Sequence, residues 1–168
     1  MVDGAAIRTK DGSGIRFRTG VSVELQELLG GNASFGTLIG NAAMLTKNGI
    51  ITAPTLDITD GSVVTVEQTK WYSDIYYHAA MVGIPDNANA YQVQLAGRGY
   101  VTVTYADGGS ATFYTDFDEN NVRSMYDIAV KLMAMHNDEV NYPEEQYRLT
   151  GDAYTVVTYI INTVENAK

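Results

Sequence analysis

The most specific arrangement of chemically useful side chains in this sequence is an acidic segment that resembles a calcium-binding loop. Oxygen-bearing side chains stand at positions 1, 3, 5, 9 and 12 of the segment, and they are Asp116, Asp118, Asn120, Ser124 and Asp127. This is the spacing of an EF-hand loop, in which hard oxygen ligands surround Ca²⁺. The acidic and amide members, Asp116, Asp118, Asn120 and Asp127, are therefore candidate calcium ligands, and no other cofactor is predicted.

Other features of the same segment favour helix capping instead of calcium. Position 6 is Asn121 where an EF-hand has glycine, position 12 is Asp127 where it has a bidentate glutamate, and a predicted strand precedes the loop. Asn120 or Asn121 would cap the helix that follows, with the acids near its positive N-terminal end. Both interpretations stay open at this point.

The two histidines are the candidates for acid and base catalysis at neutral pH. Neither His78 nor His136 stands in the context of a catalytic triad, and His136 lies on the apolar stripe of a predicted helix, where a packed histidine is expected. A glycosidase would need only two carboxylates, but no segment singles out a pair. The chain has no cysteine, which excludes thiolate nucleophiles, cysteine zinc sites and disulfides. We therefore predict no catalytic residue and no enzyme.

A second set of candidates follows from the alternation of side chains along the predicted strands. Successive side chains of a strand point to opposite faces, and the face opposite the apolar set carries tyrosines, amides, an arginine and an acid. The candidate glycan-binding residues on it are Tyr72, Asp74, Tyr76, Gln94, Arg98, Tyr100 and Tyr114. Aromatic rings stack on the C–H faces of sugars, while polar side chains hydrogen-bond the hydroxyls.

The alternative is that this face is core. The amphipathic helix predicted over 121–137 must bury its apolar stripe, and the same sheet face is available to it. Tyr100 and Tyr114 would then be buried, and Arg98 would form a structural ion pair with an acid. Exposed aromatic side chains favour glycan binding, and aromatic side chains buried under the helix favour a structural role.

The elements expected to position these residues are mostly strands. A hairpin is predicted over 4–20 around the turn Lys10-Asp-Gly-Ser-Gly14. Further strands are predicted at 33–39, 63–72, 75–84, 91–105 and 110–116, an edge or connecting segment at 50–58, and helical segments at 21–29, 41–46, 121–137 and 154–164. Gly97 and Gly99 indicate a bulge or a close backbone approach around Arg98.

This pattern predicts a mainly β (α+β) fold, an antiparallel β-sandwich or curved sheet with a helix after the last hairpin and a helical C-terminus. The β-branched residues of 154–163 leave a C-terminal strand as the alternative. A chain of 168 residues has the size of one domain. We expect a single domain over 1–168, with a β-rich core at 1–118 and a helical part at 119–168.

Charge and hydropathy limit the partners. The formal net charge is -9 at pH 7, which argues against nucleic acid and against anionic membranes. No apolar run has the length of a transmembrane helix, so no membrane insertion is predicted. The N-terminal Met-Val-Asp-Gly lacks the basic and apolar regions of a signal peptide, and we expect the chain to be the mature fragment of a longer protein.

Four segments together resemble a known type of module: 6–19 (Ala-Ile-Arg-Thr-Lys-Asp-Gly-Ser-Gly-Ile-Arg-Phe-Arg-Thr), 35–39 (Phe-Gly-Thr-Leu-Ile), 97–108 (Gly-Arg-Gly-Tyr-Val-Thr-Val-Thr-Tyr-Ala-Asp-Gly) and 121–124 (Asn-Val-Arg-Ser). The chain is similar to an accessory β-rich module of large secreted or wall-attached proteins of anaerobic Gram-positive bacteria. The resemblance covers roughly the first four-fifths of the chain and carries no catalytic signature. It implies a secreted or cell-surface location beside polysaccharide-handling modules.

These observations lead to one preferred function and one alternative. The preferred function is a non-catalytic extracellular module that binds a polysaccharide or cell-wall glycan, next to other modules of a larger protein. The alternative is a structural spacer or a protein-interaction (adhesin) module with no small ligand.

Overall fold

The computed structural model describes residues 4–8, 14–68 and 70–168, and its chain forms two compact units. The described parts of 17–79 and 94–122 make the first, here called the sheet unit. The described parts of 1–16, 80–93 and 123–168 make the second, here called the helical unit. The turn predicted at 10–14 lies mostly outside the described residues.

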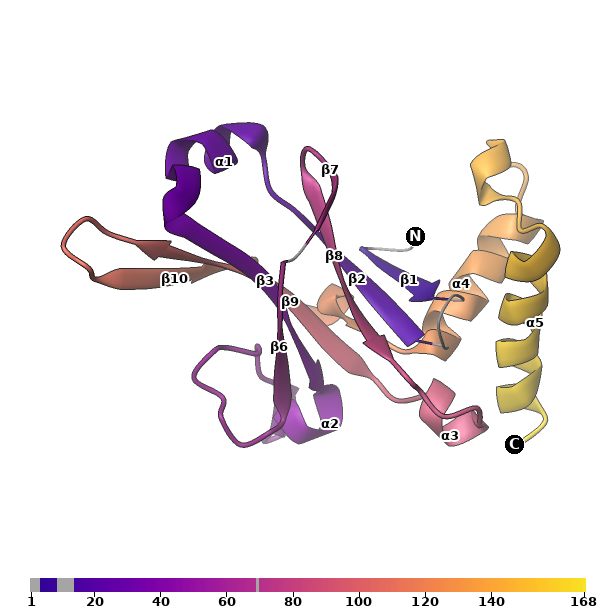
Figure 1. The fold of residues 1–168 in the computed structure, drawn as a ribbon. Helices are drawn as coiled ribbons and strands as arrows, with labels where there is room; N and C mark the ends of the chain where they lie inside the picture. Colours follow the sequence, from indigo (N-terminus) through magenta and orange to yellow (C-terminus); the bar gives the residue numbers. More distant parts are fainter. Residues whose placement is uncertain (1–3, 9–13, 69) are drawn as a thin grey trace. The chain divides into compact units, whose positions relative to one another are not determined.

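The main sheet belongs to the sheet unit (Figure 1). It contains β3 (Ala33–Asn41), β6 (Val63–Glu67), β9 (Leu95–Thr104), β10 (Ser110–Tyr114) and β11 (Val122–Arg123). The strand order is β10-β9-β3-β6, and β11 pairs with β9. The β3, β6, β9 and β10 pairings are antiparallel. The predicted hairpin between β9 and β10 is present, and Gly108 in its turn has φ 85°.

A second sheet has the order β1-β2-β8-β7. Its strands are β1 (Ala5–Arg8), β2 (Gly14–Gly20), β7 (Trp71–Ser73) and β8 (Tyr76–Val82). A short hairpin of β4 (Thr46–Lys47) and β5 (Ile50–Ile51) turns at Asn48 and Gly49, with φ 52° and 78°. Positive φ at both turn residues is what a two-residue Asn-Gly turn requires.

The sheet unit is packed closely where side chains of β2 meet the glycines of β9. A Cβ atom on Gly97 would lie 2.4 Å from Phe17 Cδ1, and one on Gly99 would lie 2.5 Å from Thr19 Cγ2. The close approach predicted around Arg98 is therefore confirmed. Glycine is required at positions 97 and 99, because the Phe17 and Thr19 side chains occupy the space that a Cβ atom would need.

Short helices complete the sheet unit. α1 (Val23–Leu29) begins at Ser22, whose Oγ accepts from Leu25 N at 3.2 Å, and it ends at Gly30 with φ 56°. The 3₁₀ turns η1 (Gly30–Asn32) and η2 (Glu119–Asn121) and the helix α2 (Ala42–Leu45) follow along the chain. The buried apolar residues Ala42, Leu45, Ala96 and Val122 form one core cluster of this unit.

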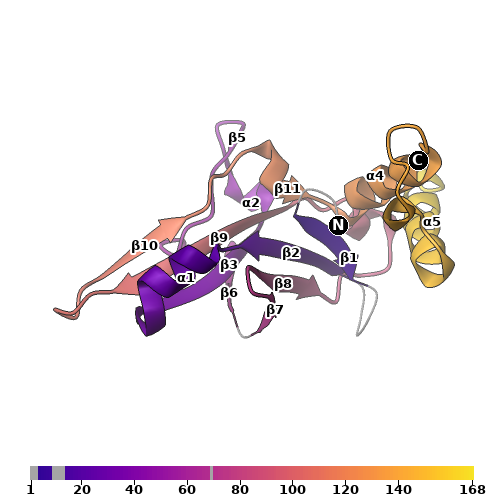
Figure 2. The ribbon, with the colours of Figure 1, turned by 90° about the horizontal axis from the view of Figure 1, so that it is seen from above.

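Helices dominate the helical unit. They are α3 (Ala88–Tyr91), α4 (Met125–Asn137), the 3₁₀ turn η3 (Glu145–Tyr147) and α5 (Gly151–Glu165). α4 and α5 lie side by side (Figures 1 and 2). Each helix buries one stripe, and the buried residues are Met125, Ile128 and Ala129 on α4, and Val157, Ile160 and Val164 on α5.

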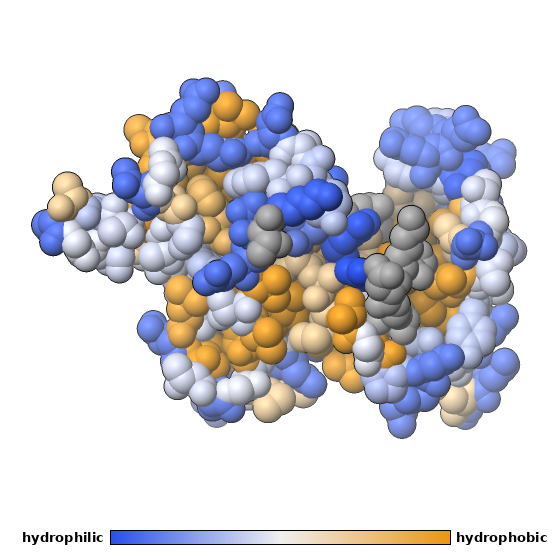
Figure 3. All heavy atoms as spheres, viewed as in Figure 1, coloured by the Kyte–Doolittle hydropathy of each residue, from blue (hydrophilic) through white to orange (hydrophobic). Residues whose placement is uncertain are grey.

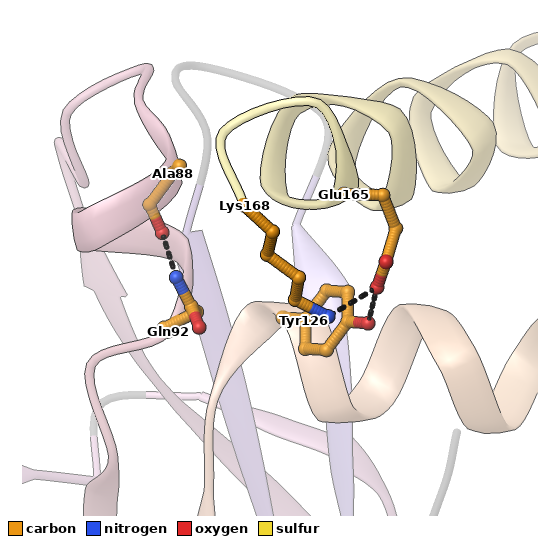
Figure 4. Close-up of polar contacts among 5 residues, drawn as sticks. All are labelled: Ala88, Gln92, Tyr126, Glu165 and Lys168. Atoms are coloured by element: carbon orange, nitrogen blue, oxygen red, sulfur yellow. Dashed lines mark hydrogen bonds and ion pairs between the residues drawn. The ribbon is translucent and has the colours of Figure 1, made fainter.

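Polar contacts join α4 to the C-terminal end of α5 (Figure 4). Tyr126 on α4 donates its hydroxyl to Glu165 Oε1 on α5, and Lys168 Nζ lies 2.7 Å from the same oxygen. Figure 4 also shows Gln92 donating to the Ala88 carbonyl at the end of α3, at 3.0 Å.

The fold is α+β with antiparallel sheets and a helical C-terminus, as predicted. The strand alternative for 154–163 is wrong, because α5 covers this segment. The single strand predicted at 63–72 is two strands, β6 and β7, in different sheets. The strand predicted from 91 begins only at Leu95, because the Asn87 side chain accepts from Ala90 N and starts α3.

Candidate functional site

The seven predicted glycan-binding residues fall into separate groups. Arg98, Tyr100 and Tyr114 lie on β9 and β10, and Tyr72, Asp74 and Tyr76 lie on or beside β7 and β8. Gln94 belongs to neither group. It lies just before β9, and its backbone carbonyl accepts from Ala42 N at 2.9 Å. The structure therefore does not assemble one continuous glycan-binding face from these residues.

The group on β9 and β10 is structural. Tyr100 and Tyr114 are register partners, and Tyr100 is only 7% exposed, so its predicted exposure is wrong. The segment 52–58 of the same unit contacts the neighbouring Tyr114, whose hydroxyl accepts from Leu56 N at 3.2 Å. Burial raises the pKa of the Tyr100 phenol, and the nearby Glu67 carboxylate raises it further.

Arg98 also contacts the segment 52–58. Its Nε donates to the Thr115 carbonyl at 2.8 Å, and its Nη1 donates to the Pro54 carbonyl at 3.3 Å. Its guanidinium carbon lies 4.6 Å from the centre of the Tyr114 ring. The ion pair with an acid that the structural alternative predicted is not present among the described residues, where Arg98 contacts two carbonyls and an aromatic ring.

The second group contributes to a groove between α1 and β7, here called the α1–β7 groove. It has a volume of about 630 Å³. Its lining residues are Val23, Gln26, Glu27, Trp71, Tyr72, Ser73 and Asp74. Two predicted glycan residues, Tyr72 and Asp74, line it. Tyr76 does not, and its ring instead stacks with Arg18, whose guanidinium carbon lies 4.5 Å from the ring centre.

A β-bulge brings two neighbouring aromatic residues to this groove. Trp71 pairs with Tyr77 and Ser73 pairs with Tyr76, so Tyr72 is an extra residue on β7. In a regular strand Trp71 and Tyr72 would point to opposite faces. A bulge re-aims side chains, and here both residues line one groove.

Trp71 is held firmly by its neighbours. Its ring centre lies 5.7 Å from that of Phe35 and 5.5 Å from that of Tyr77, both in edge-to-face geometry. The side-chain amide of Gln68 is oriented so that its oxygen accepts from the indole N–H of Trp71 at 2.9 Å. Tyr77 in turn donates its hydroxyl to the Gly36 carbonyl at 2.6 Å. Trp71 is thus a fixed aromatic wall of the groove.

Tyr72 is the exposed aromatic residue of the groove, with 57% of its surface accessible. His78 lies against its ring with 4.0 Å between the ring centres, and Lys70 Nζ lies 5.7 Å from the ring centre. Over α1, on the face that Figure 3 shows, hydrophobic and hydrophilic residues lie side by side. Apolar and polar groups are therefore next to one another on this part of the surface.

Gln26 ties the two walls of the groove together. Its Nε2 donates to the Val21 carbonyl at 3.0 Å and to the Asp74 carbonyl at 2.5 Å. The exposed side chains of Glu27, Ser73 and Asp74 supply oxygen atoms around this bridge. The groove therefore combines aromatic surfaces with hydroxyl, amide and carboxylate groups.

A smaller, apolar hollow of about 210 Å³ lies in the same unit. Its lining includes Leu25, Phe35, Tyr77, Tyr100, Phe113 and Tyr114. Leu25 is partly exposed and Phe113 is 56% exposed, so the hollow adjoins an accessible apolar surface.

The acidic segment serves as a set of helix caps. Asp118 Oδ1 accepts from Asn120 N at 2.7 Å, and Asn121 Oδ1 accepts from Asp118 N at 2.8 Å. α4 begins at Ser124, not at Asn120 or Asn121 as predicted, because Ser124 and Asp127 cap each other's backbone N–H at 3.0 Å. Within 4–8, 14–68 and 70–168, no three acidic or histidine side chains form a group that could hold a metal ion.

His136 has the packed environment predicted for it. Its Nδ1 accepts from Leu149 N at 3.0 Å, and its ring lies 5.5 Å from that of Tyr154. His136 therefore joins the end of α4 to the segment before α5.

No family model, curated protein or solved structure matches the chain. None of the helices in the described residues is both long and apolar enough to span a membrane.

The sequence interpretation missed several residues of the groove. Trp71 was not among the candidates, although its indole both packs on Phe35 and Tyr77 and lines the groove. The sequence indicated a helix at Gln26 and Glu27 but did not indicate that these residues line a groove. Only the position of α1 next to β7 reveals them.

Proposed function

We propose that the chain is a non-catalytic extracellular module that binds carbohydrate in the α1–β7 groove. The observation that carries this proposal is the bulge at Tyr72, which places two adjacent aromatic residues along a groove with polar side chains at its rim. Trp71 would stack on the C–H face of a sugar ring, and Asp74, Gln26 and Ser73 would hydrogen-bond its hydroxyls.

The dimensions of the groove are consistent with a short stretch of glycan. Ligand pockets range from about 300 to 1,000 Å³, and the groove at about 630 Å³ falls within this range. It is open to solvent on one side and built from few aromatic residues. We therefore expect weak affinity for a single module, strengthened by repetition in a multimodular parent.

The resemblance described above supports the cellular context of the proposal. A module of secreted or wall-attached proteins of Gram-positive bacteria would meet polysaccharides and cell-wall glycans, beside other modules of its parent. The net charge of -9 is consistent with this choice over nucleic acid.

The first test is affinity electrophoresis of the domain in native gels that contain starch, xylan, glucomannan, pectin or soluble cellulose derivatives, with calcium or with a chelator. We expect retardation by at least one polymer, reduced by Tyr72→Ala. Tyr105→Ala removes a tyrosine of similar exposure, 49% against 57% for Tyr72, near the turn of the β9–β10 hairpin and is the matched control. Equal retardation of both variants would contradict the proposal.

The alternative is a protein-interaction module, and α1 carries the observation that favours it. None of the side chains of α1 is buried, Leu28 is 82% exposed, and Leu25 and Phe113 line the apolar hollow. Exposed apolar residues beside a hollow are a feature of interaction surfaces. If no polymer retards the domain, this alternative becomes the better explanation.

A further inference from the structure

Two carboxylates stand among the lining residues of the α1–β7 groove. Glu27 on α1 and Asp74 between β7 and β8 line the groove, and both are exposed. In the part of the chain that the structure describes, neither carboxylate takes part in an ion pair. Glu24 lies one helical turn before Glu27, on the same side of α1. These three carboxylates outnumber Lys70, the cation that lies against the Tyr72 ring, so acidic groups predominate around the groove.

The aromatic residues of the groove also favour positive charge. The faces of tryptophan and tyrosine attract ammonium groups through their quadrupoles. Lys70 already shows this attraction, since its Nζ lies 5.7 Å from the centre of the Tyr72 ring. Carboxylates and aromatic faces in one groove are complementary to a ligand that combines sugar rings with ammonium groups.

We propose that the α1–β7 groove selects glycans that carry amino groups, such as chains of glucosamine units, over glycans that carry uronic acids. This rests on the proposed function. Each ammonium group near Glu27 or Asp74 would add a charge-assisted hydrogen bond. Each uronate would instead face like charges in the groove and in a chain of net charge -9. Neutral glycans would bind with intermediate affinity.

The only tryptophan of the sequence, Trp71, reports binding directly. Its fluorescence is followed at low salt while three oligomers of equal length are added: glucosamine with protonated amines, N-acetylglucosamine, and galacturonate. The first two share a ring and differ at one nitrogen, which is a charged ammonium in the first and a neutral acetamide in the second. Exposed ion pairs are individually weak, so for two carboxylates we expect about fivefold tighter binding of the glucosamine oligomer than of the acetylated one, and no saturable change with galacturonate.

The preference is assigned to the groove with charge-removing variants. Glu27→Gln with Asp74→Asn should reduce the ratio of the two affinities from about five to about one, because this ratio depends on the two carboxylate charges that the variant removes. The control, Glu139→Gln with Glu144→Gln, removes two exposed carboxylates from the helical unit and should keep the preference.

The outcomes separate this inference from the function on which it rests. The inference is overturned if both glucosamine oligomers bind equally, if the groove variant keeps the preference, or if the control loses it to the same degree. If none of these oligomers and no neutral polymer changes the Trp71 signal, glycan binding itself is wrong and the inference fails with it.

Discussion

Replacing Gly97 by alanine should destabilise the sheet unit, because Phe17 fills the space that a methyl group would need. A Cβ atom there would lie 2.4 Å from Phe17 Cδ1, 2.7 Å from Cε1 and 2.8 Å from Cγ. Phe17 is buried, so its ring cannot swing into solvent, and a strand must shift instead. Overpacking of this kind costs about 1 to 3 kcal/mol, and we expect the free energy of unfolding to fall by that amount.

Urea denaturation followed by Trp71 fluorescence measures this loss within the same unit. Gly31→Ala is the matched control, since its Cβ atom would meet no atom within 4 Å and its φ is not positive. We expect Gly31→Ala to stay within about 0.5 kcal/mol of the parent, as surface substitutions usually do. An equal free energy of unfolding for the two variants would refute the reasoning.

A double-mutant cycle tests the cause of the loss. Phe17→Ala removes the ring and by itself costs about 3 to 5 kcal/mol. In that background Gly97→Ala no longer meets the ring, so the two losses should fail to add, with a coupling of about 1 to 3 kcal/mol. If the Gly97→Ala loss persists in full without the ring, contact with Phe17 is not its cause.

Two further predictions concern hydrogen bonds. Tyr77→Phe leaves the Gly36 carbonyl without the 2.6 Å bond that it accepts, and should lower the free energy of unfolding by about 1 to 2 kcal/mol in urea; unchanged stability would contradict this. Contacts with Lys168 and Tyr126 lower the pKa of Glu165 below its usual 4.5. Because the pKa of Glu165 is lower in the folded than in the unfolded state, its ionised carboxylate stabilises the fold above pH 4.5. This stabilisation is lost as the pH falls through the pKa of the folded state. The melting temperature should therefore fall less below pH 4.5 in Glu165→Gln than in the parent, and parallel profiles would show that this contact contributes nothing.

Local patterns were enough to predict most elements of the fold. The apolar spacing of 121–137 predicts a helix, and α4 occupies Met125–Asn137 with Ile128 and Ala129 buried. The hairpin turn at Gly108 and the glycine end of α1 at Gly30 were likewise predictable, because both need a positive φ. Such features depend on neighbouring residues alone.

Features that depend on distant residues could not be predicted. Alternation places Tyr100 and Val101 on opposite faces, but it does not indicate that Tyr100 is buried or that the segment 52–58 contacts Tyr114 and Arg98. The bulge at Tyr72 is equally hidden, because it exists only in the register of β7 against β8. Sequence periodicity predicts which side chains share a face, but not what lies on that face.

The candidate site depends most on such distant contacts. Tyr72 and Asp74 were chosen from alternation, yet their groove also includes Gln26 on α1, which donates to the Asp74 carbonyl, a contact between residues 48 positions apart. The same contact brings Glu27 of the helix to the groove that Trp71 lines. The ligand preference proposed for the groove therefore arises from α1 and β7 together, and neither segment alone carries it.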